Sequence, residues 1–477
     1  MLFGKLFSVS SVILTTGLSL QLVSAQVYTS CSDTKAGECA AAPSYRTCQG
    51  VDGVETCGAC LDGYIQKFHR KTKEVPVNPN DCFSIDSITS LDEYRAVHEA
   101  VIVDDTRSDA DHLQNLIDTA RLISAHNSQS PQPPQYFLDI NHLSLLTEAD
   151  MGVINGHRSD NFAEEAKFDF HPGLETGNRK LQTPPSSVNW VTRGAVTPVK
   201  NQGQCGCCWT ISTVGAIEGI AAIQSNYTFL ESLSFQQLIS CDTANNQQGC
   251  NGGNVINAMS YSEGNAGNTL GGMTDYSQYP FTDIGGKTST ACLLSQKNDS
   301  LVVAVRNTGF YLKSSSPSSY ASRVSNMKSA LVNQPVSILM NARCTHFQSY
   351  SHGILTTDQP GCQCGPGLPG CIDHAILMVG YDDTGSTPYW LIKNSWAATW
   401  GEQGYFRVAQ SPSASGNWGL FGVLSQGSAP LFASNNTAAV PQTSGSMSIV
   451  GVTSSAFIST IAMMATSLLA SVVSFSG

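Results

Sequence analysis

The sequence predicts an α+β protein in which a disulfide-rich module and a helical segment precede a larger compact domain. Its 477 residues exceed one ordinary domain and indicate two or three compact units with appended segments. Apolar residues recur at helical spacing within residues 92–127 and again within residues 209–224. The β-rich part of the fold is predicted from sequence motifs within residues 184–432.

Residues 1–25 have the features of a secretory signal peptide. Lys5 precedes an apolar run at residues 6–20, which is too short to span a membrane, and Val23, Ser24 and Ala25 supply a small-residue cleavage site. Three glycosylation sequons are compatible with secretion: Asn226, Asn298 and Asn435. The sequence therefore predicts the secretory pathway, with the outside of the cell, its surface or an acidic lysosome- or vacuole-like compartment as destination.

Residues 26–84 are expected to form a small disulfide-stapled module. Its six cysteines are Cys31, Cys39, Cys48, Cys57, Cys60 and Cys82. The sequence does not choose among their pairings. Cys57 and Cys60 have the spacing of a redox motif, but the βαβ context of one is missing, so a structural role is favoured.

Residues 85–183 are expected to be a helical segment. The apolar positions at helical spacing are Val97, Val101, Leu113, Leu116, Ile117 and Ile123. Prolines at positions 131, 133 and 134 end the pattern. The net charge of −11 comes mainly from residues ahead of position 184. No basic patch is visible, which argues against nucleic acid as a partner.

Three motifs in the compact domain carry reactive groups. Cys208 lies in a Gly- and Cys-rich stretch, residues 202–209, and His374 and Asn394 follow it by 166 and 186 residues. A thiol, an imidazole and an amide in this order are typical of a cysteine hydrolase, because the imidazole activates the thiol and the amide orients the imidazole. Neither a cofactor nor a metal is expected.

These motifs, together with Gln202, resemble the papain-like, cathepsin L-type cysteine peptidases. The resemblance covers residues 184–432 and implies a two-lobed papain-like fold, with a helical lobe opened by Cys208 and a β-rich, barrel-like lobe bearing His374 and Asn394. It implies an endopeptidase that hydrolyses proteins and peptides through a thioester acyl-enzyme. The paired histidines of a cathepsin B-type occluding loop are not visible, which favours endopeptidase over dipeptide trimming. A helix dipole and the His374 imidazolium would lower the pKa of Cys208.

The resemblance also assigns the parts of a substrate cleft. Gln202 and the Cys208 backbone N–H would form the oxyanion hole, where loss of a donor typically costs about 100- to 1,000-fold in rate. Trp396 would cover the contact between His374 and Asn394. The substrate-binding residues would be Gly252 and Gly253 in a backbone wall, Asp373 beside the histidine, Trp396, and the apolar Leu339 and Val423, which line the pocket for the residue just before the cleaved one.

The cysteines of the compact domain are expected to form disulfides. The resemblance pairs Cys205 with Cys250 and Cys241 with Cys292. The other four can form two further bridges in three ways: Cys344, Cys362, Cys364 and Cys371. Cys207 is left over beside the nucleophile, either as a small buried side chain or as a redox partner.

Ahead of the peptidase domain, residues 85–183 resemble an inhibitory propeptide. Leu116, Ile123 and Asn127 match the family's interrupted helical motif, and Asn141 lies in a stretch similar to its second motif. The resemblance implies a zymogen whose own propeptide is its inhibitor and is cleaved within residues 181–185. Cystatin-like proteins are further expected inhibitors.

Residues 433–477 read as a Ser/Thr-rich linker and a hydrophobic tail. No Asp, Glu, Lys or Arg follows Arg407. Small residues, a spacer and a terminal apolar stretch favour a GPI-attachment signal. The alternative is a spanning helix, which normally ends against Lys or Arg. Contact with a membrane is expected only through this tail.

Two other functions remain open from the sequence. One is a catalytically silent papain-like scaffold that acts as a surface binding module. The other is a transferase built from a similar triad. The complete set of Gln202, Cys208, His374 and Asn394 favours the peptidase.

Overall fold

The computed structural model describes most of the chain from residue 82 to residue 430. Side chains are described for residues 60, 62–66, 82–103, 106–129, 135–158, 184–264, 271–288, 291–294, 312, 319–359, 361–368 and 370–430. Strands at residues 28–29, 46–51, 54–59, 169–170, 301–303 and 308–311 are described by their backbone alone. The predicted signal peptide, the tail and the sequons at Asn298 and Asn435 lie outside the described residues. None of the described helices is long and apolar enough to cross a membrane.

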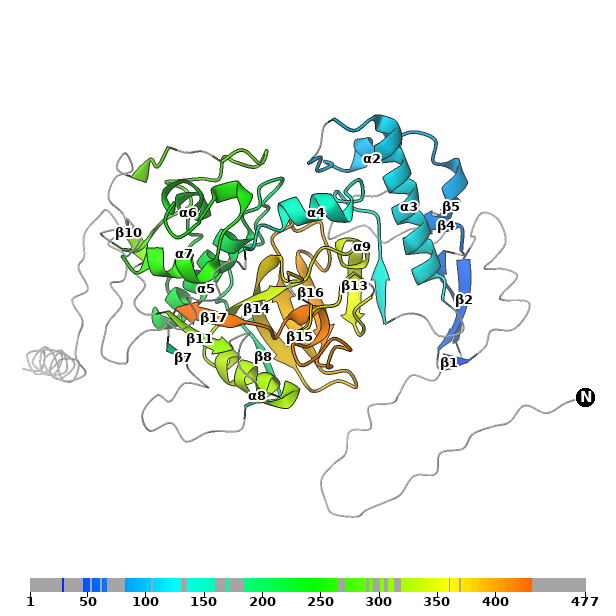
Figure 1. The fold of residues 1–477 in the computed structure, drawn as a ribbon. Coiled ribbons are helices and arrows are strands. Elements are labelled where there is room, and N and C mark those ends of the chain that lie inside the picture. Colours follow the sequence, from blue (N-terminus) through cyan, green and yellow to red (C-terminus); the bar gives the residue numbers. More distant parts are fainter. Residues whose placement is uncertain are drawn as a thin grey trace, which may run out of the picture.

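The N-terminal module is built of short antiparallel strands. β1 (Tyr28–Thr29), β2 (Arg46–Val51) and β3 (Val54–Cys60) form one sheet, and β4 (Tyr64–Gln66) pairs with β5 (Cys82–Ser84). Cys60 is bonded to Cys82. Ile65 is buried, and the Gly63 N–H donates to Ser124 Oγ at 2.9 Å. The module therefore packs against the helical segment that follows it (Figure 1).

Within residues 92–127, where the apolar periodicity suggested one continuous pattern, the structure has two separate helices. η1 (Ile85–Ser87) and α2 (Asp92–Val97) are short, and α3 (Asp109–Asn127) is a separate helix with its own N-terminus. The new start is a capping box, in which Ser108 and Asp111 each accept a hydrogen bond from the other's backbone N–H. Leu116 and Ile123 lie on the buried side of α3. The segment continues through β6 (Tyr136–Leu138), α4 (Glu148–Ile154) and β7 (Asp169–Phe170).

One lobe of the compact domain is mainly helical. Its elements are α5 (Cys208–Gln224), α6 (Phe235–Cys241), η3 (Gly249–Asn251), α7 (Val255–Ser262), β9 (Met273–Thr274) and β10 (Leu301–Val303). The sequence pattern predicted an amphipathic helix after Cys208, whereas α5 is buried over almost its whole length, its few polar side chains included. A helix without a solvent-exposed polar face belongs in the interior, and α5 is the central helix of this lobe.

The other lobe is built on a large mixed sheet. The strands run in the order β6-β13-β16-β15-β14-β12-β17-β11-β7, and β8 also pairs with β14. Their bounds are β8 (Ser187–Asn189), β11 (Thr308–Leu312), β12 (Val336–Met340), β13 (Tyr350–Leu355), β14 (His374–Asp382), β15 (Tyr389–Lys393), β16 (Tyr405–Ala409) and β17 (Gly427–Pro430). α8 (Tyr320–Leu331), α9 (Thr345–Gln348) and η5 (Leu420–Gly422) connect them.

The two lobes meet along α5 and β14. Ser212 of α5 donates to the Ile376 carbonyl at 2.7 Å, and Gly215 lies against the Leu377 side chain. In Figure 1 the helices of the first lobe and the strands of the second lie side by side, and α4 of the leading segment lies along the top of both. The predicted two-lobed α+β fold is confirmed.

Candidate active site

Cys208 is the first residue of α5, and its side chain is fully buried. The N-terminal N–H groups of a helix lack partners within the helix, so the positive end of the α5 dipole lies at this thiol. Cys208 Sγ accepts a hydrogen bond from the Ala375 N–H at 3.4 Å. Because Ala375 follows His374 in β14, this contact brings the thiol of one lobe to the histidine strand of the other.

His374 and Asn394 lie at the ends of neighbouring strands. His374 begins β14, Asn394 follows β15, and His374 Nε2 lies 2.9 Å from Asn394 Oδ1. An amide oxygen accepts, so it keeps the proton on Nε2. His374 Nδ1 is buried and has no hydrogen-bond partner among the described residues. The buried Trp396 ring stacks on the imidazole with centroids 5.0 Å apart.

Burial keeps both reactive groups neutral in this structure. It raises the pKa of Cys208 to about 12 and lowers the pKa of His374 to about 4, although the Asn394 hydrogen bond acts in the opposite direction on His374. The thiolate–imidazolium pair expected from the sequence is therefore disfavoured in this form of the chain. A charged group is stable only where water or polar partners solvate it. The leading segment covers the site and keeps water away from it.

Gln202 lies beside Cys208 with its amide fixed at both ends. The Ser395 hydroxyl donates to Gln202 Oε1 at 2.6 Å. Gln202 Nε2 donates to the Cys205 carbonyl at 2.9 Å and to the Ile154 carbonyl at 2.8 Å. The Ile154 carbonyl of the leading segment thus accepts from Gln202 Nε2, the N–H donor that the sequence analysis assigned to an oxyanion hole.

The leading segment continues from Ile154 along the Gly-rich wall of the cleft. The Arg158 N–H donates to the Gly253 carbonyl and the Gly253 N–H to the Gly156 carbonyl, both at 2.9 Å. The His157 N–H donates to the Asp373 carbonyl at 2.9 Å. These are backbone bonds of the kind an extended peptide would form, and the pairing of His157 with Gly253 is parallel. The segment therefore fills the cleft as a pseudo-substrate.

Comparison with known proteins gives the family. The family model described as papain family cysteine protease matches residues 184–422. The chain is 36% identical over 316 residues to cysteine proteinase EP-B 1 of Hordeum vulgare, covering 65% of this chain and 76% of that protein. It is 35% identical over 324 residues to a vignain of Ricinus communis, covering 65% and 78%. The chain belongs to the papain family of cysteine proteases.

Solved structures of papain-family proforms are similar to this chain, including its leading segment. The proform of the ragweed cysteine protease Amb a 11 gives a TM-score of 0.54 at 27% identity, covering 69% of this chain and 90% of that one. Digestive procathepsin L 3 of Tenebrio molitor gives 0.55 at 25%, covering 72% and 97%. The chain is thus a papain-like cysteine endopeptidase zymogen, and the segment in its cleft is its inhibitory propeptide.

Two glycines let the propeptide approach the catalytic loop closely. A Cβ on Gly156 would lie 1.7 Å from the Gly206 carbonyl oxygen, and a Cβ on Gly206 would lie 2.5 Å from the Cys250 carbonyl oxygen. Neither position can hold a larger residue without movement of backbone. This tight crossing lies directly beside Cys205 and Cys208 and explains the complete burial of the thiol.

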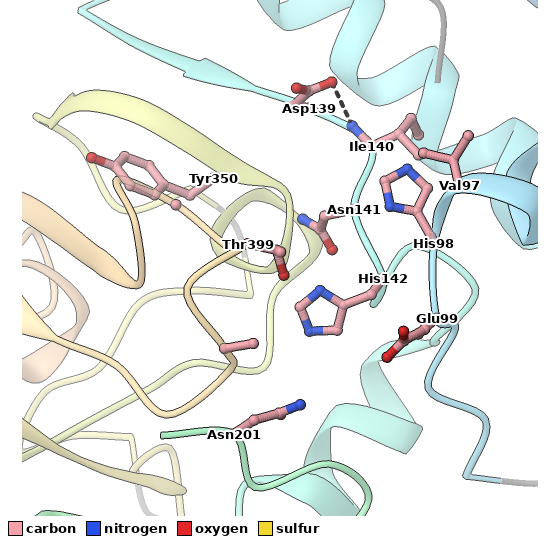
Figure 2. Close-up of a pocket in the computed structure, with 12 residues that line it drawn as sticks. Val97, His98, Glu99, Asp139, Ile140, Asn141, His142, Asn201, Tyr350 and Thr399 are labelled. Carbon is pink, nitrogen blue, oxygen red and sulfur yellow. Dashed lines mark hydrogen bonds between the residues drawn. The ribbon is translucent and has the colours of Figure 1, made fainter. Parts of the chain in front are cut away.

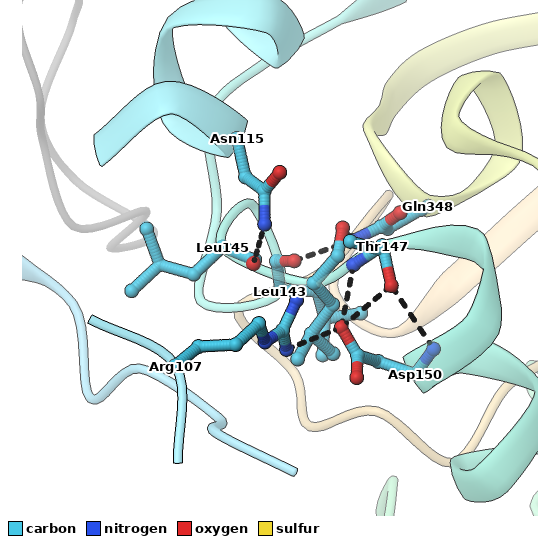
Figure 3. A network of polar contacts seen from close by, with 8 residues as sticks. Arg107, Asn115, Leu143, Leu145, Thr147, Asp150 and Gln348 are labelled. Carbon is cyan, nitrogen blue, oxygen red and sulfur yellow. Dashed lines mark hydrogen bonds and ion pairs between the residues drawn. The ribbon is translucent and has the colours of Figure 1, made fainter. Parts of the chain in front are cut away.

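A second contact holds the propeptide against the β lobe. Gln348 of α9 donates to the Leu143 carbonyl, and Asn141 Nδ2 donates to the Gln348 carbonyl at 2.9 Å. Figure 3 shows the same stretch tied to the rest of the propeptide through Asn115, Arg107 and Asp150. The Asn141 motif found in the sequence is therefore a second part of the propeptide that docks on the peptidase domain.

A cavity of about 140 Å³ lies between the propeptide and the peptidase domain. Figure 2 shows His98, Glu99 and His142 of the propeptide facing Asn201 and Thr399 of the peptidase domain. Ala397 also lines it and has a φ of 65°, in the left-handed region that favours glycine. Alanine there costs about 1–2 kcal/mol.

The residues assigned to the apolar pocket are brought together. Leu339 lies in β12 and Val423 directly after η5, and both are buried. The Asn341 N–H donates to the Phe421 carbonyl at 2.8 Å, which joins the two elements. Gly252, with a φ of 107°, lies at the propeptide, since a Cβ there would approach the Gly156 carbonyl oxygen to 2.6 Å. Asp373 accepts from Asn155 Nδ2 of the propeptide at 3.2 Å.

The structure pairs the cysteines of the peptidase domain. Cys205 is bonded to Cys250 and Cys241 to Cys292. The pairing that the sequence left open is Cys344 with Cys362 and Cys364 with Cys371. Cys207 is unbonded and fully buried, and burial raises its thiol pKa. A buried neutral thiol oxidises poorly, which favours packing as the role of Cys207.

Three residues of the site escaped the sequence analysis. Gly156 and His157 lie in a part of the propeptide without a recognised motif, and Arg343 lies in a loop beside Asp373. Their roles depend on chain segments that are distant in sequence. The described residues contain no cluster of three or more His, Cys, Asp or Glu suited to a metal ion. Asn226 is exposed, at the end of α5.

Proposed function

We propose that this protease cleaves polypeptides after removal of the propeptide, with Cys208 as nucleophile, His374 as acid and base, Asn394 as the residue that orients His374, and Gln202 as oxyanion donor. The observation that carries this proposal is the hydrogen-bonded arrangement of these side chains at one end of α5 and β14. The propeptide contacts Gln202 through the Ile154 carbonyl and Gly253 through residues 156–158, where a substrate would lie.

The reaction follows from the same contacts. Once the propeptide leaves, water reaches the cleft, and the proton of Cys208 passes to His374 Nδ1. The thiolate attacks the substrate carbonyl, whose oxygen accepts from Gln202 Nε2 and the Cys208 N–H. The C–N bond breaks, the amine leaves with the proton from His374, and a thioester remains. Water, deprotonated by His374, cleaves the thioester, releases the acid and restores the thiol.

A thiol-directed epoxide peptide tests the proposal directly. The matured protein should form one covalent adduct, on Cys208, and lose peptidase activity in proportion. A folded, matured protein that takes up no label and cleaves no peptide would instead be a silent scaffold displayed as a binding module.

Substrates with a bulky apolar residue just before the cleaved one are expected to react faster than substrates with Arg there. Leu339 and Val423 offer apolar surface to that side chain. We expect at least about a tenfold difference in kcat/KM, the size of one lost pocket contact. Matched fluorogenic peptides with Leu or Arg at this position measure it; equal rates would show that the pocket lies elsewhere.

Maturation of the zymogen is expected to be faster at pH 4.5 than at pH 7, by about tenfold or more. Histidines meet where the propeptide contacts the peptidase domain: His126 of α3 lies 5.8 Å from His346 of α9, centroid to centroid. Burial lowers the pKa of His346 to about 4, and that of His157, beside His374, to about 3.

These lowered histidine pKa values predict that acid weakens the closed form of the zymogen. A histidine with a pKa of about 4 in the closed form and about 6.5 when released favours closure above pH 6.5, and that contribution is lost as the pH falls toward 4. Asp373, with a pKa raised by burial to about 6, acts in the opposite direction. Processing followed on gels should accelerate through this window. An unchanged profile in a double His126→Gln, His346→Gln variant would exclude this pair as the cause.

We also propose that the protein travels the secretory pathway and is held at a membrane by a GPI anchor that replaces its tail. The uncharged apolar end and the small-residue spacer support this proposal. Phosphatidylinositol-specific phospholipase C should release the protein from cells. Retention with an intact C-terminus in mass spectrometry would indicate a spanning helix instead.

A further inference from the structure

The propeptide shows which side of the cleft receives the leaving group of a substrate. Its Ile154 carbonyl lies on the oxyanion donor Gln202, and its residues 156–158 pair with Gly253. Under the proposed function, Gly253 belongs to the backbone wall assigned to the substrate, and we place the substrate residues before the scissile bond along it. Propeptide residues ahead of Ile154 therefore cover the side on which residues after the scissile bond would lie.

Arg343 is the cation on that side. A Cβ on Gly152 of α4 would lie 3.7 Å from Arg343 Nε, in ordinary contact. Arg343 Nε donates to Asp373 Oδ2 at 3.2 Å, and 44% of the Arg343 side chain is exposed. Among the described residues, none forms a hydrogen bond with its two terminal nitrogens. These nitrogens are the edge of a guanidinium that binds a carboxylate with two parallel hydrogen bonds.

The loop that carries Arg343 is fixed on both sides. The Ala342 N–H donates to Asp373 Oδ1 at 3.0 Å, and the Arg343 N–H donates to Asn341 Oδ1 at 3.2 Å. Asn341 in turn donates to the Gly361 carbonyl at 2.9 Å, and the following residue, Cys344, is bonded to Cys362. The loop therefore presents the guanidinium at a defined place beside Asp373.

Asp373 binds Arg343 through Nε and leaves the two terminal nitrogens of the guanidinium without a hydrogen bond from it. Its carboxylate is buried, with one oxygen bonded to the Ala342 N–H and the other to Arg343 Nε. The Arg343 side chain remains 44% exposed beside this contact. The propeptide already brings a carboxylate near this surface: Glu148, one helical turn before Gly152, lies at Gly361 and Cys344.

We infer that Arg343 forms a carboxylate-binding subsite on the leaving-group side of the cleft, so that the protease prefers Glu or Asp at the first or second position after the scissile bond. This inference rests on the proposed function. Because the guanidinium is partly exposed, its attraction is screened by water, and the expected preference is about two- to fivefold.

The test uses enzyme matured from the full chain and internally quenched peptides that differ only after the scissile bond. Glu, Gln or Lys is placed at the first or the second position, at pH 6.5, and the cleaved bond is identified by mass spectrometry. Three variants are compared with the wild type: Arg343→Gln, which can still donate to Asp373, Arg343→Lys, which keeps the charge without the fork, and Arg193→Gln. Arg193 is exposed over the Trp190 ring, away from the cleft, and is the matched control.

The wild type and Arg193→Gln should cleave the Glu peptide about two- to fivefold faster than the Gln peptide, in kcat/KM. Arg343→Gln should bring this ratio to about one, Arg343→Lys should lie between, and salt should lower the wild-type ratio. A wild-type ratio of one or less, or the same ratio in wild type and Arg343→Gln, overturns the inference. Failure to cleave the Gln peptide at all would overturn the proposed function instead.

Discussion

Replacing Cys208 by alanine is expected to lower kcat by about a million-fold, the loss seen when the nucleophile of a hydrolase with a comparable triad is removed. Neither His374 nor Gln202 can replace a thiol that forms a covalent bond to the substrate. The chain should still fold, because the side chain is small and belongs to no disulfide. Turnover of a fluorogenic peptide measures the loss, and thermal unfolding of the zymogen checks the fold.

Cys207→Ser is the matched control for this substitution. It removes a neighbouring buried thiol that is also free of any disulfide, yet it leaves Cys208 and its hydrogen bond from Ala375 unchanged. Activity in reducing buffer should therefore persist. If the Cys208→Ala enzyme retained even one tenth of the wild-type rate, or if Cys207→Ser were the inactive variant, the nucleophile would be wrongly assigned.

The substitution Gly156→Val is expected to displace the propeptide from the cleft and expose Cys208 in the unprocessed chain. The valine Cβ would overlap the Gly206 carbonyl oxygen, so the propeptide could stay in the cleft only if one of two backbones moved. Overpacking of this kind costs about 1–3 kcal/mol. We therefore expect the unprocessed Gly156→Val chain to react with an epoxide peptide at pH 7 about ten- to a hundredfold faster than the wild-type zymogen.

Gly152→Ala is the control for the propeptide. Gly152 lies in α4 with a helical backbone, and the nearest atom to an added Cβ is 3.7 Å away. Alanine favours a helix by about 1 kcal/mol over glycine, so masking should be kept or improved. Equal labelling rates for Gly156→Val and wild type would mean that the crossing of Gly156 and Gly206 does not limit access to Cys208.

The catalytic residues could be found in the sequence because reactive chemistry restricts residue types. A nucleophilic thiol, an imidazole and an orienting amide have few substitutes, so Cys208, His374 and Asn394 stand in recognisable motifs although 186 residues separate the first from the last. The two lobes could be predicted for the same reason, through resemblance. Helix periodicity was less informative: it merged α2 with α3 and described the buried α5 as amphipathic.

The remaining features depend on contacts between distant segments. The closeness of Gly156 to Gly206 is visible only after the propeptide is laid in the cleft. The pairing of Cys344 with Cys362 follows from the loop path and not from spacing. The neutral state of Cys208 and His374 likewise arises from burial under a segment that lies some 50 residues before Cys208 and some 220 before His374 in the chain. Such packing cannot be predicted from the residues near each position in the sequence.

Strand β6 of the propeptide completes one edge of the enzyme's own sheet. It pairs with β13, where the Asp139 N–H donates to the Ser349 carbonyl at 2.8 Å and the Ile354 N–H to the Gln135 carbonyl at 3.0 Å. When the propeptide leaves, the backbone groups of β13 lose these partners, and an unpaired edge readily adds a strand from another chain. Maturation therefore leaves β13 without a partner strand on the side where β6 had paired. We therefore expect the matured protease to be more prone than its zymogen to strand-to-strand self-association.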